Sequence, residues 1–262
     1  MLRCGKLEFE EMTRIPPPKD ESMTNPSLWL VLDEVVDPQN FGALLRSAYF
    51  LGGGGNGKSK SPAGVISSIG EGQGPYGNSN VGILVCSKNS APPSSVVSAA
   101  SAGALELCTV YSTPNLPRTL QAAKENGWRI LGAAALTPSN VSSNDNTDGN
   151  QIECVDLYDL PPAIVADSND NGSESVPTIL VLGSEGRGLR KLVAKACTSF
   201  VRIPGVGMDY ASDNSSSSSE GDGEDYRFGR TGEGNDVAAG VDSLNVSVTG
   251  GILLWHLLHG RL

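Results

Sequence analysis

The apolar residues of this chain fall in short runs that alternate with stretches of helical periodicity. The runs are bounded by polar residues or glycine, which is typical of strands buried on both faces of a sheet. We predict strands over residues 28–35, 81–86, 128–136, 178–186 and 199–205. Apolar spacings of three and four predict helices over residues 40–52, 116–127, 188–197 and 243–260. Strands alternating with helices indicate an α/β fold, a mostly parallel sheet flanked by helices.

Three segments interrupt this pattern, at about residues 52–80, 138–177 and 206–241. They are rich in Gly, Ser, Asn and Asp and poor in apolar residues. Such segments cannot bury enough apolar surface to offset the entropy lost on ordering. We therefore expect three disordered inserts.

The net charge of −10 is unusual for a protein that binds nucleic acid. Residues 138–177 contain eight acidic residues and no Lys or Arg, and residues 205–242 contain nine acidic residues and two arginines. The rest of the chain therefore carries a net charge of +5. The acidity belongs to the inserts, and the remaining part is mildly basic.

The five cysteines are scattered and form no C-x-x-C pair. This argues against a disulfide framework or a zinc site and favours a reducing compartment. No apolar run reaches about 18 residues, so we expect no membrane-spanning segment. The first residues resemble neither a signal peptide nor a transit peptide, and we expect that any leader has been removed or was not included.

A glycine-rich stretch, LGGGGNGKSKSP (51–62), fits the phosphate-binding pattern G-x-x-x-x-G-K-[ST] through Gly52, Gly57, Lys58 and Ser59. A phosphate loop must leave a strand and open a helix. Here the glycines follow a predicted helix, and Pro62 discourages the start of another. We interpret the stretch as part of an insert.

Three other motifs agree with one another and give a stronger signal than the glycine-rich stretch. They are LDEVVDPQNFGALLRSA (32–48), ILVLGSEGRGLR (179–190), and a divided third motif, VRIPG (201–205) with DSLNVSVTGGILLWHLL (242–258). Together they resemble the signature motifs of the SpoU (TrmH) branch of the SPOUT RNA methyltransferases, which transfer a methyl group from S-adenosylmethionine to a ribose 2′-oxygen. Residues 88–128 resemble the mitochondrial and bacterial enzymes that methylate a guanosine of large-subunit ribosomal RNA, the mitochondrial ones most closely.

This resemblance implies a SPOUT α/β knot, with a C-terminal trefoil knot, over residues 27–262. Related enzymes carry an N-terminal RNA-recruiting domain. We expect residues 1–26 to be a linker or a remnant of such a domain. The insert at 206–241 divides the third motif at the cofactor loop.

The resemblance places Asn40 and Arg46 at the reacting ribose, with Arg46 also contacting RNA. From the residues alone, Asn40 could instead cap or turn the chain at DPQN, and Arg46 could form a surface salt bridge or clamp a phosphate. A guanidinium hardly loses its proton. Orienting a phosphate and stabilising the developing alkoxide suits Arg46 better than acting as a base.

The remaining site residues that the resemblance implies lie in the second and third motifs. Glu185 would join the polar active-site set, and Arg187 would contact RNA. Ser243 and Asn245 would either cap the last helix or face the methyl acceptor. The implied cofactor-binding residues are Leu182, Gly183, Gly186, Ile203, Pro204 and Leu244, with Ile203 and Leu244 making backbone contacts to adenine. The glycines also suit a strand-to-helix turn with positive φ.

The last helix is apolar nearly all round, which predicts burial against both the sheet and a partner subunit. The alternative is a helix buried within one subunit. We expect His256 and His259 on the helix surface or at the interface, and two histidines without a third ligand form no metal site. The reaction needs no metal, because the sulfonium centre is already an activated methyl donor.

The sequence therefore predicts a homodimeric S-adenosylmethionine-dependent 2′-O-methyltransferase acting on a guanosine of large-subunit ribosomal RNA, in the mitochondrion or otherwise in another organelle or the cytoplasm. The alternatives are a non-catalytic RNA-binding or ribosome-assembly module of the same fold, and a transfer RNA 2′-O-methyltransferase.

Overall fold

The computed structural model describes residues 7–18, 26–52, 81–133, 153–163, 176–204 and 244–259. Their strands form one sheet in the order β1-β4-β3-β2-β7-β5-β8-β6, and every neighbouring pair is parallel. The strands are β1 (Glu10–Glu11), β2 (Leu28–Leu32), β3 (Val81–Cys86), β4 (Val110–Thr113), β5 (Arg129–Ala133), β6 (Cys154–Asp156), β7 (Thr178–Leu182) and β8 (Ser199–Arg202). The predicted parallel α/β sheet is confirmed.

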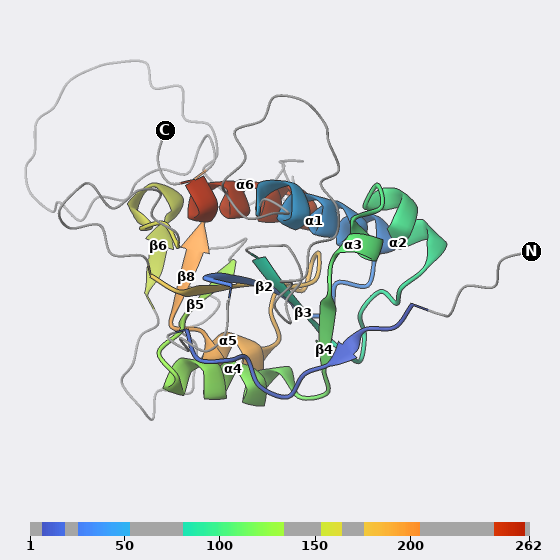
Figure 1. The fold of residues 1–262 in the computed structure, drawn as a ribbon. Helices are drawn as coiled ribbons and strands as arrows, with labels where there is room; N and C mark the ends of the chain where they lie inside the picture. The colour runs from blue at the N-terminus through green and yellow to red at the C-terminus, as the bar shows by residue number, and fades with distance from the viewer. Residues whose placement is uncertain are drawn as a thin grey trace, which may run out of the picture.

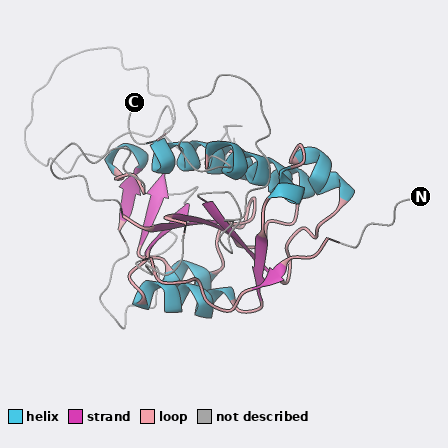
Figure 2. Ribbon diagram, viewed as in Figure 1, coloured by secondary structure: helices cyan, strands magenta, loops and turns pink. Residues whose placement is uncertain are grey.

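Helices cover both faces of this sheet (Figures 1 and 2). The upper layer in Figure 1 holds α1 (Pro38–Leu51), α2 (Ser95–Ala100), α3 (Ala104–Leu107) and α6 (Val246–His259). The lower layer holds α4 (Leu116–Glu125) and α5 (Lys191–Ala196), and a 3₁₀ helix, η2 (Leu157–Asp159), follows β6. The molecule is thus a three-layer sandwich.

The central strand β2 shows why the sheet needs both layers, since all five of its residues are buried. Leu28, Leu30 and Leu32 pack in the cluster that includes the buried faces of α1 and α6. Trp29 and Val31 point to the other cluster, which includes residues of α4 and α5. Because side chains alternate along a strand, a continuous apolar run fits only a sheet covered on both faces.

Helices α1 and α6 lie side by side and run in the same direction. Asn40 contacts Asn245 near their starts, and a Cβ at Gly250 would collide with Leu44. A Cβ at Gly251 would have Ser47 as its nearest neighbour. This alignment brings the starts of both helices to the edge of the sheet where β2 and β7 end.

Helix α1 begins where the sequence indicates. Asp37 is its N-cap and accepts a hydrogen bond from the backbone N–H of Gln39 at 3.1 Å, with Pro38 in the first turn. The preceding strand ends at Leu32, earlier than predicted, because Glu34 adopts a left-handed φ of 61°. Asn40 lies inside the helix, so the N-cap alternative for Asn40 does not apply.

The expectation of disorder across the insert at 138–177 is wrong for residues 153–163. Residues 153–163 are ordered, with β6 pairing to β8 through Cys154–Phe200 and Val155–Val201 and η2 following. A strand of three half-buried residues leaves too short an apolar pattern to detect. Residues 138–152 and 164–175 of this insert, residues 53–80 of the insert predicted at 52–80, and the whole of the insert at 206–241 lie outside the described residues.

The segment before residue 27 joins the same sheet. Residues Glu10 and Glu11 pair with β4, Ile15 is buried in the lower core, and the Trp128 indole donates to the carbonyl of Pro16 at 2.8 Å. The sequence pattern did not predict β4, α2 or α3 either. The trefoil knot stays a prediction, because the chain between Pro204 and Leu244 lies outside the described residues.

None of the helices in the described part of the chain has the length and apolar character needed to cross a membrane.

The close approach of α6 to α1 predicts opposite effects at two neighbouring glycines. A Cβ at Gly250 would meet Leu44 and lie 2.7 Å from Cδ1 of Leu182, whereas at Gly251 the nearest atom would be 3.8 Å away. We expect Gly250→Val to lower the free energy of unfolding by about 2 kcal/mol or more. Gly251→Ala should be neutral or stabilising by up to about 1 kcal/mol. Urea denaturation measures both, and equal stabilities would contradict this packing.

Candidate active site

The motif residues gather at the edge of the sheet where β2 and β7 end and α6 begins. In a parallel sheet the carboxyl ends of neighbouring strands meet at one edge, and Leu32 pairs with Leu182 at the last position of both strands. The chain then turns upward into α1 after β2 and downward into α5 after β7 (Figure 1). Such a divergence of neighbouring connections opens the crevice in which α/β proteins bind ligands.

Three polar side chains from distant parts of the sequence meet at this edge. Nδ2 of Asn245 donates to Oδ1 of Asn40 at 3.0 Å and to Oε1 of Glu185 at 2.6 Å. Asn40 is buried, while Glu185 and Asn245 are exposed. The structure thus brings together one predicted site residue from each of the three motifs.

Asn245 also caps α6. Its Oδ1 accepts hydrogen bonds from the backbone N–H of Ser247 at 2.8 Å and from the Ser247 hydroxyl at 2.6 Å. The Glu185 carboxylate lies 3.5 Å from the backbone N–H of Val246, where the positive end of the helix dipole favours a negative charge. Asn245 therefore caps the helix, the first alternative left open by the sequence, and its amide also joins the polar cluster.

The loop after β7 is folded tightly on itself. Ser184 and Gly188 exchange backbone hydrogen bonds of 3.1 and 2.9 Å. A Cβ at Gly183 would collide with the backbone of Gly188 and lie 2.6 Å from the amide nitrogen of Leu189, so this position requires glycine. Gly186 has a φ of 78° and open space where a Cβ would stand. Its exposed backbone leaves room for a ligand to approach closely.

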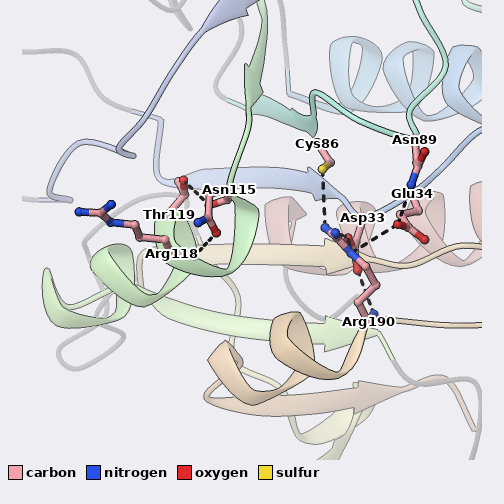
Figure 3. Close-up of polar contacts among 8 residues, drawn as sticks. All are labelled: Asp33, Glu34, Cys86, Asn89, Asn115, Arg118, Thr119 and Arg190. Atoms are coloured by element: carbon pink, nitrogen blue, oxygen red, sulfur yellow. Dashed lines mark hydrogen bonds and ion pairs between the residues drawn. The ribbon is translucent and has the colours of Figure 1, made fainter.

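An ion pair next to this loop, between the buried Asp33 and the partly exposed Arg190, was not predicted from the sequence (Figure 3). The Asp33 side chain is completely buried, and Arg190 donates to it from its backbone N–H at 3.0 Å and from Nε at 2.7 Å. The hydrogen bond to Asp33 raises the pKa of Arg190 above its ordinary value. An acid directly after a buried strand, with an arginine closing the GSEGRGLR loop, was the available signal.

Arg46 is not part of this cluster. It is exposed on α1, six residues and about 9 Å along the helix axis from Asn40. No described residue forms an ion pair with it. Arg187 is also exposed, at the tip of the glycine loop.

The predicted cofactor residues surround the same edge with different exposures. Ile203 and Pro204 are half-buried just after β8, and Leu244 is exposed just before α6. Leu182 is fully buried, and its carbonyl accepts the backbone N–H of Asp33 at 2.8 Å. Ser243 lies outside the described residues.

The prediction for His256 is wrong. His256 is buried, and its Nε2 lies 2.8 Å from the carbonyl oxygen of Leu160, which can only accept, so Nε2 carries the proton. Residues 160–163 dock on α6 in this way, a contact that a helical pattern alone cannot show. His259 is exposed and stacks on Trp255 with ring centroids 4.4 Å apart. Among the described residues no group of three or more His, Cys, Asp or Glu is arranged to hold a metal ion.

Comparisons with known proteins agree with this architecture. The sequence profile of the SpoU rRNA Methylase family matches residues 77–219, more than half of the chain. A TrmH-family protein of Porphyromonas gingivalis has a similar solved structure, with a TM-score of 0.51 and 25% sequence identity, covering 93% of this chain and 64% of that one. The predicted fold class is therefore confirmed.

Two curated relatives are both named "rRNA methyltransferase 1, mitochondrial". The protein from Schizosaccharomyces pombe is 31% identical over 242 residues, 92% of this chain and 54% of that protein. The protein from Dictyostelium discoideum is 29% identical over 232 residues, 88% of this chain and 28% of that protein. This chain thus spans about half of one relative and about a quarter of the other.

The family profile starts after the first motif and ends before α6, so Asn40 and Asn245 lie outside the matched range. Sequence profile, motif order and fold nevertheless agree with one another. The chain belongs to the SpoU rRNA methylase family.

Proposed function

We propose that this protein transfers a methyl group from S-adenosylmethionine to the ribose 2′-hydroxyl of a guanosine in large-subunit ribosomal RNA. The contact among Asn40, Asn245 and Glu185 beside the glycine loop is the observation that carries the proposal. Membership of the SpoU rRNA methylase family and the names of the relatives support the reaction and the RNA class.

The residues at the sheet edge suit the cofactor. The open backbone at Gly186, with Gly183, Ile203, Pro204 and the exposed Leu244, would hold it, mainly through main-chain groups. The buried Leu182 can contribute to the apolar floor. When bound, the sulfonium supplies a methyl group already activated for transfer.

The polar cluster would handle the acceptor hydroxyl. Asn245 donates to Oδ1 of Asn40, so the Nδ2 group of Asn40 is left to donate to a ribose oxygen. Among Asn40, Asn245, Glu185 and Arg46, the Glu185 carboxylate is the group able to accept a proton, since amides are not basic and a guanidinium is already protonated. The Glu185 carboxylate would therefore receive the hydroxyl proton. Ser243, two residues before Asn245, would face the same acceptor.

Arg46 and Arg187 would bind RNA phosphates. Both are exposed, and a guanidinium binds phosphate in a bidentate manner. Salt should weaken such contacts.

We also propose that residues 27–262, together with the earlier segment that adds β1 to their sheet, form the catalytic domain and that the protein acts in the mitochondrion. The mitochondrial relatives support this compartment.

A homodimer would complete the site. On α6, Leu253, Leu254 and Leu257 are buried within the chain, while Val248, Ile252 and Trp255 are 36–48% exposed. On the neighbouring α1, Phe50 is 80% exposed. An apolar face on the outer side of two adjacent helices suits a second copy of the chain, as the motif resemblance implies.

The first functional prediction concerns ligands and chemistry. Calorimetry should show S-adenosylmethionine binding in the micromolar range, near −8 kcal/mol at about 1 μM. Glu185→Gln should lower kcat for methyl transfer to large-subunit ribosomal RNA by about 100-fold or more, with a smaller effect on cofactor affinity. Lys58→Ala should change neither quantity.

ATP binding that Lys58→Ala abolishes, without any response to S-adenosylmethionine, would contradict the proposal. Cofactor binding without methyl transfer to any RNA would favour the non-catalytic alternative. Transfer to transfer RNA in preference to ribosomal RNA would correct the substrate.

The second functional prediction concerns assembly. Trp255→Glu should give a folded monomer with little methyl transfer, because a charge at the apolar face opposes its burial. Leu192→Glu is the matched control, since Leu192 is 66% exposed on α5, in the other helical layer. The Leu192→Glu variant should remain a dimer. Light scattering at micromolar concentration measures both, and a fully active monomeric wild type would refute the proposed interface.

A further inference from the structure

Asp33 and Arg190 form a polar contact at the site's edge in which three donors of Arg190 meet one carboxylate. The Asp33 side chain has no exposed surface, so its carboxylate depends on protein partners. Arg190 supplies its backbone N–H, Nε and Nη2, with Nη2 2.6 Å from Oδ1 (Figure 3). One residue thus satisfies both carboxylate oxygens.

The pair joins the two elements that carry the polar cluster. Asp33 directly follows β2 and precedes the N-cap of α1, the helix that carries Asn40. Arg190 closes the loop that carries Glu185 and is the N-cap residue of α5. The backbone N–H of Asp33 also donates to the carbonyl of Leu182, so both strand ends are fixed at one point.

The end of a third strand, β3, also contacts the guanidinium of Arg190. Nη2 of Arg190 lies 3.6 Å from Sγ of the buried Cys86, the last residue of β3. Oε1 of Glu34 lies 3.7 Å from Nε of Arg190 and accepts a hydrogen bond from Nδ2 of Asn89 at 3.1 Å. Glu34 and Asn89 both adopt left-handed backbone conformations, with φ of 61° and 58°. Such conformations persist in non-glycine residues only where surrounding contacts hold them.

The glycine loop is also held by the Glu185–Asn245 hydrogen bond to α6 and by Leu189, which packs against the lower core, but Asp33–Arg190 is its direct link to the chain between β2 and α1. Residues 185–188 are exposed, and the backbone bridge between Ser184 and Gly188 fixes the shape of the loop without tying it to α1. With Arg190 38% exposed and Asp33 buried, the ion pair is weak support for stability, because burying a charge costs solvation that the pairing must offset. Its directional hydrogen bonds instead fix relative position. We propose that Arg190, anchored by Asp33, is a positioning residue that holds Glu185 in register with Asn40 and Asn245.

This inference rests on the proposed methyl transfer. No hydrogen bond joins Arg190 to Asn40, Asn245 or Glu185 in the described part of the chain, so it acts through the loop. A displacement near 1 Å can cost a reaction about 100-fold. The loop keeps its internal bridge when it moves as a unit, so cofactor contacts within it should change less than the alignment of Glu185 with Asn40.

Arg190→Lys tests the inference, because lysine keeps the charge and the backbone N–H that binds Oδ2, but cannot place two side-chain donors on Oδ1 in a fixed fork. We expect kcat to fall about 10- to 100-fold, with the calorimetric Kd for S-adenosylmethionine changing far less. Asp33→Asn should do the same, and the double variant should lose little more than either single one.

Arg129→Lys is the matched control. Arg129 is a half-buried arginine that donates to Thr178 at 2.7–2.9 Å and to the carbonyl of Pro161 at 2.9 Å, at the amino-terminal edge of the sheet. We expect it to lower the Tm without changing kcat. A merely structural Arg190 would behave in the same way.

The outcomes separate the two proposals. A wild-type chain that transfers no methyl group would contradict the proposed function. An active wild type with unchanged kcat in folded Arg190→Lys or folded Asp33→Asn would overturn the positioning role alone. If neither variant folds, the pair is a determinant of folding, and the positioning role is likewise overturned.

Discussion

The in-register parallel pairing of β2 with β7 is the constraint on which the site depends. It ends both strands at the same level, with Leu32 beside Leu182. The chain that leaves each strand then carries one part of the polar cluster, Asn40 on α1 and Glu185 in the glycine loop. A slip of one residue would turn every side chain of the strand to the opposite face and separate these groups.

Helix α6 completes the arrangement because it packs against both elements. Gly250 lets it approach Leu44 of α1 and Leu182 of β7 closely. Its first residues therefore reach the sheet edge, where Asn245 bridges Asn40 and Glu185. At its other end, residues 160–163 satisfy groups of α6 through the His256 side chain and the carbonyl of Leu257, which accepts the backbone N–H of Ala163. The helix is thus held at both ends.

Much of the fold could be predicted because the strands are buried on both faces. Runs such as LWLVL and TILVL have one physical explanation in a chain with alternating helices. The elements that were missed are short or weakly patterned. Strand β6 has three half-buried residues, β1 has two exposed ones, and α3 spans a single turn. Their positions follow from pairing and docking, which periodicity does not record.

The candidate site could be predicted in part, because its motifs combine turn chemistry with polar residues at strand ends. Asn40, Glu185 and Asn245 meet in space as the resemblance implied, although their roles in catalysis stay proposals. The ion pair between Asp33 and Arg190 was missed, since the two residues are 157 positions apart and their only signal was their places after a buried strand and at the end of the glycine loop. The position of His256 was mispredicted for a similar reason, because its partner Leu160 lies in a segment expected to be an insert.

Hydrogen exchange with and without S-adenosylmethionine tests the central claim most directly, because it locates a bound ligand on the chain. The account predicts slower amide exchange in peptides covering residues 182–190 and 244–250, with little change in α4 on the opposite face. Protection confined to other parts of the chain, or no protection at saturating cofactor, would show that this edge of the sheet is not the methyl-transfer site.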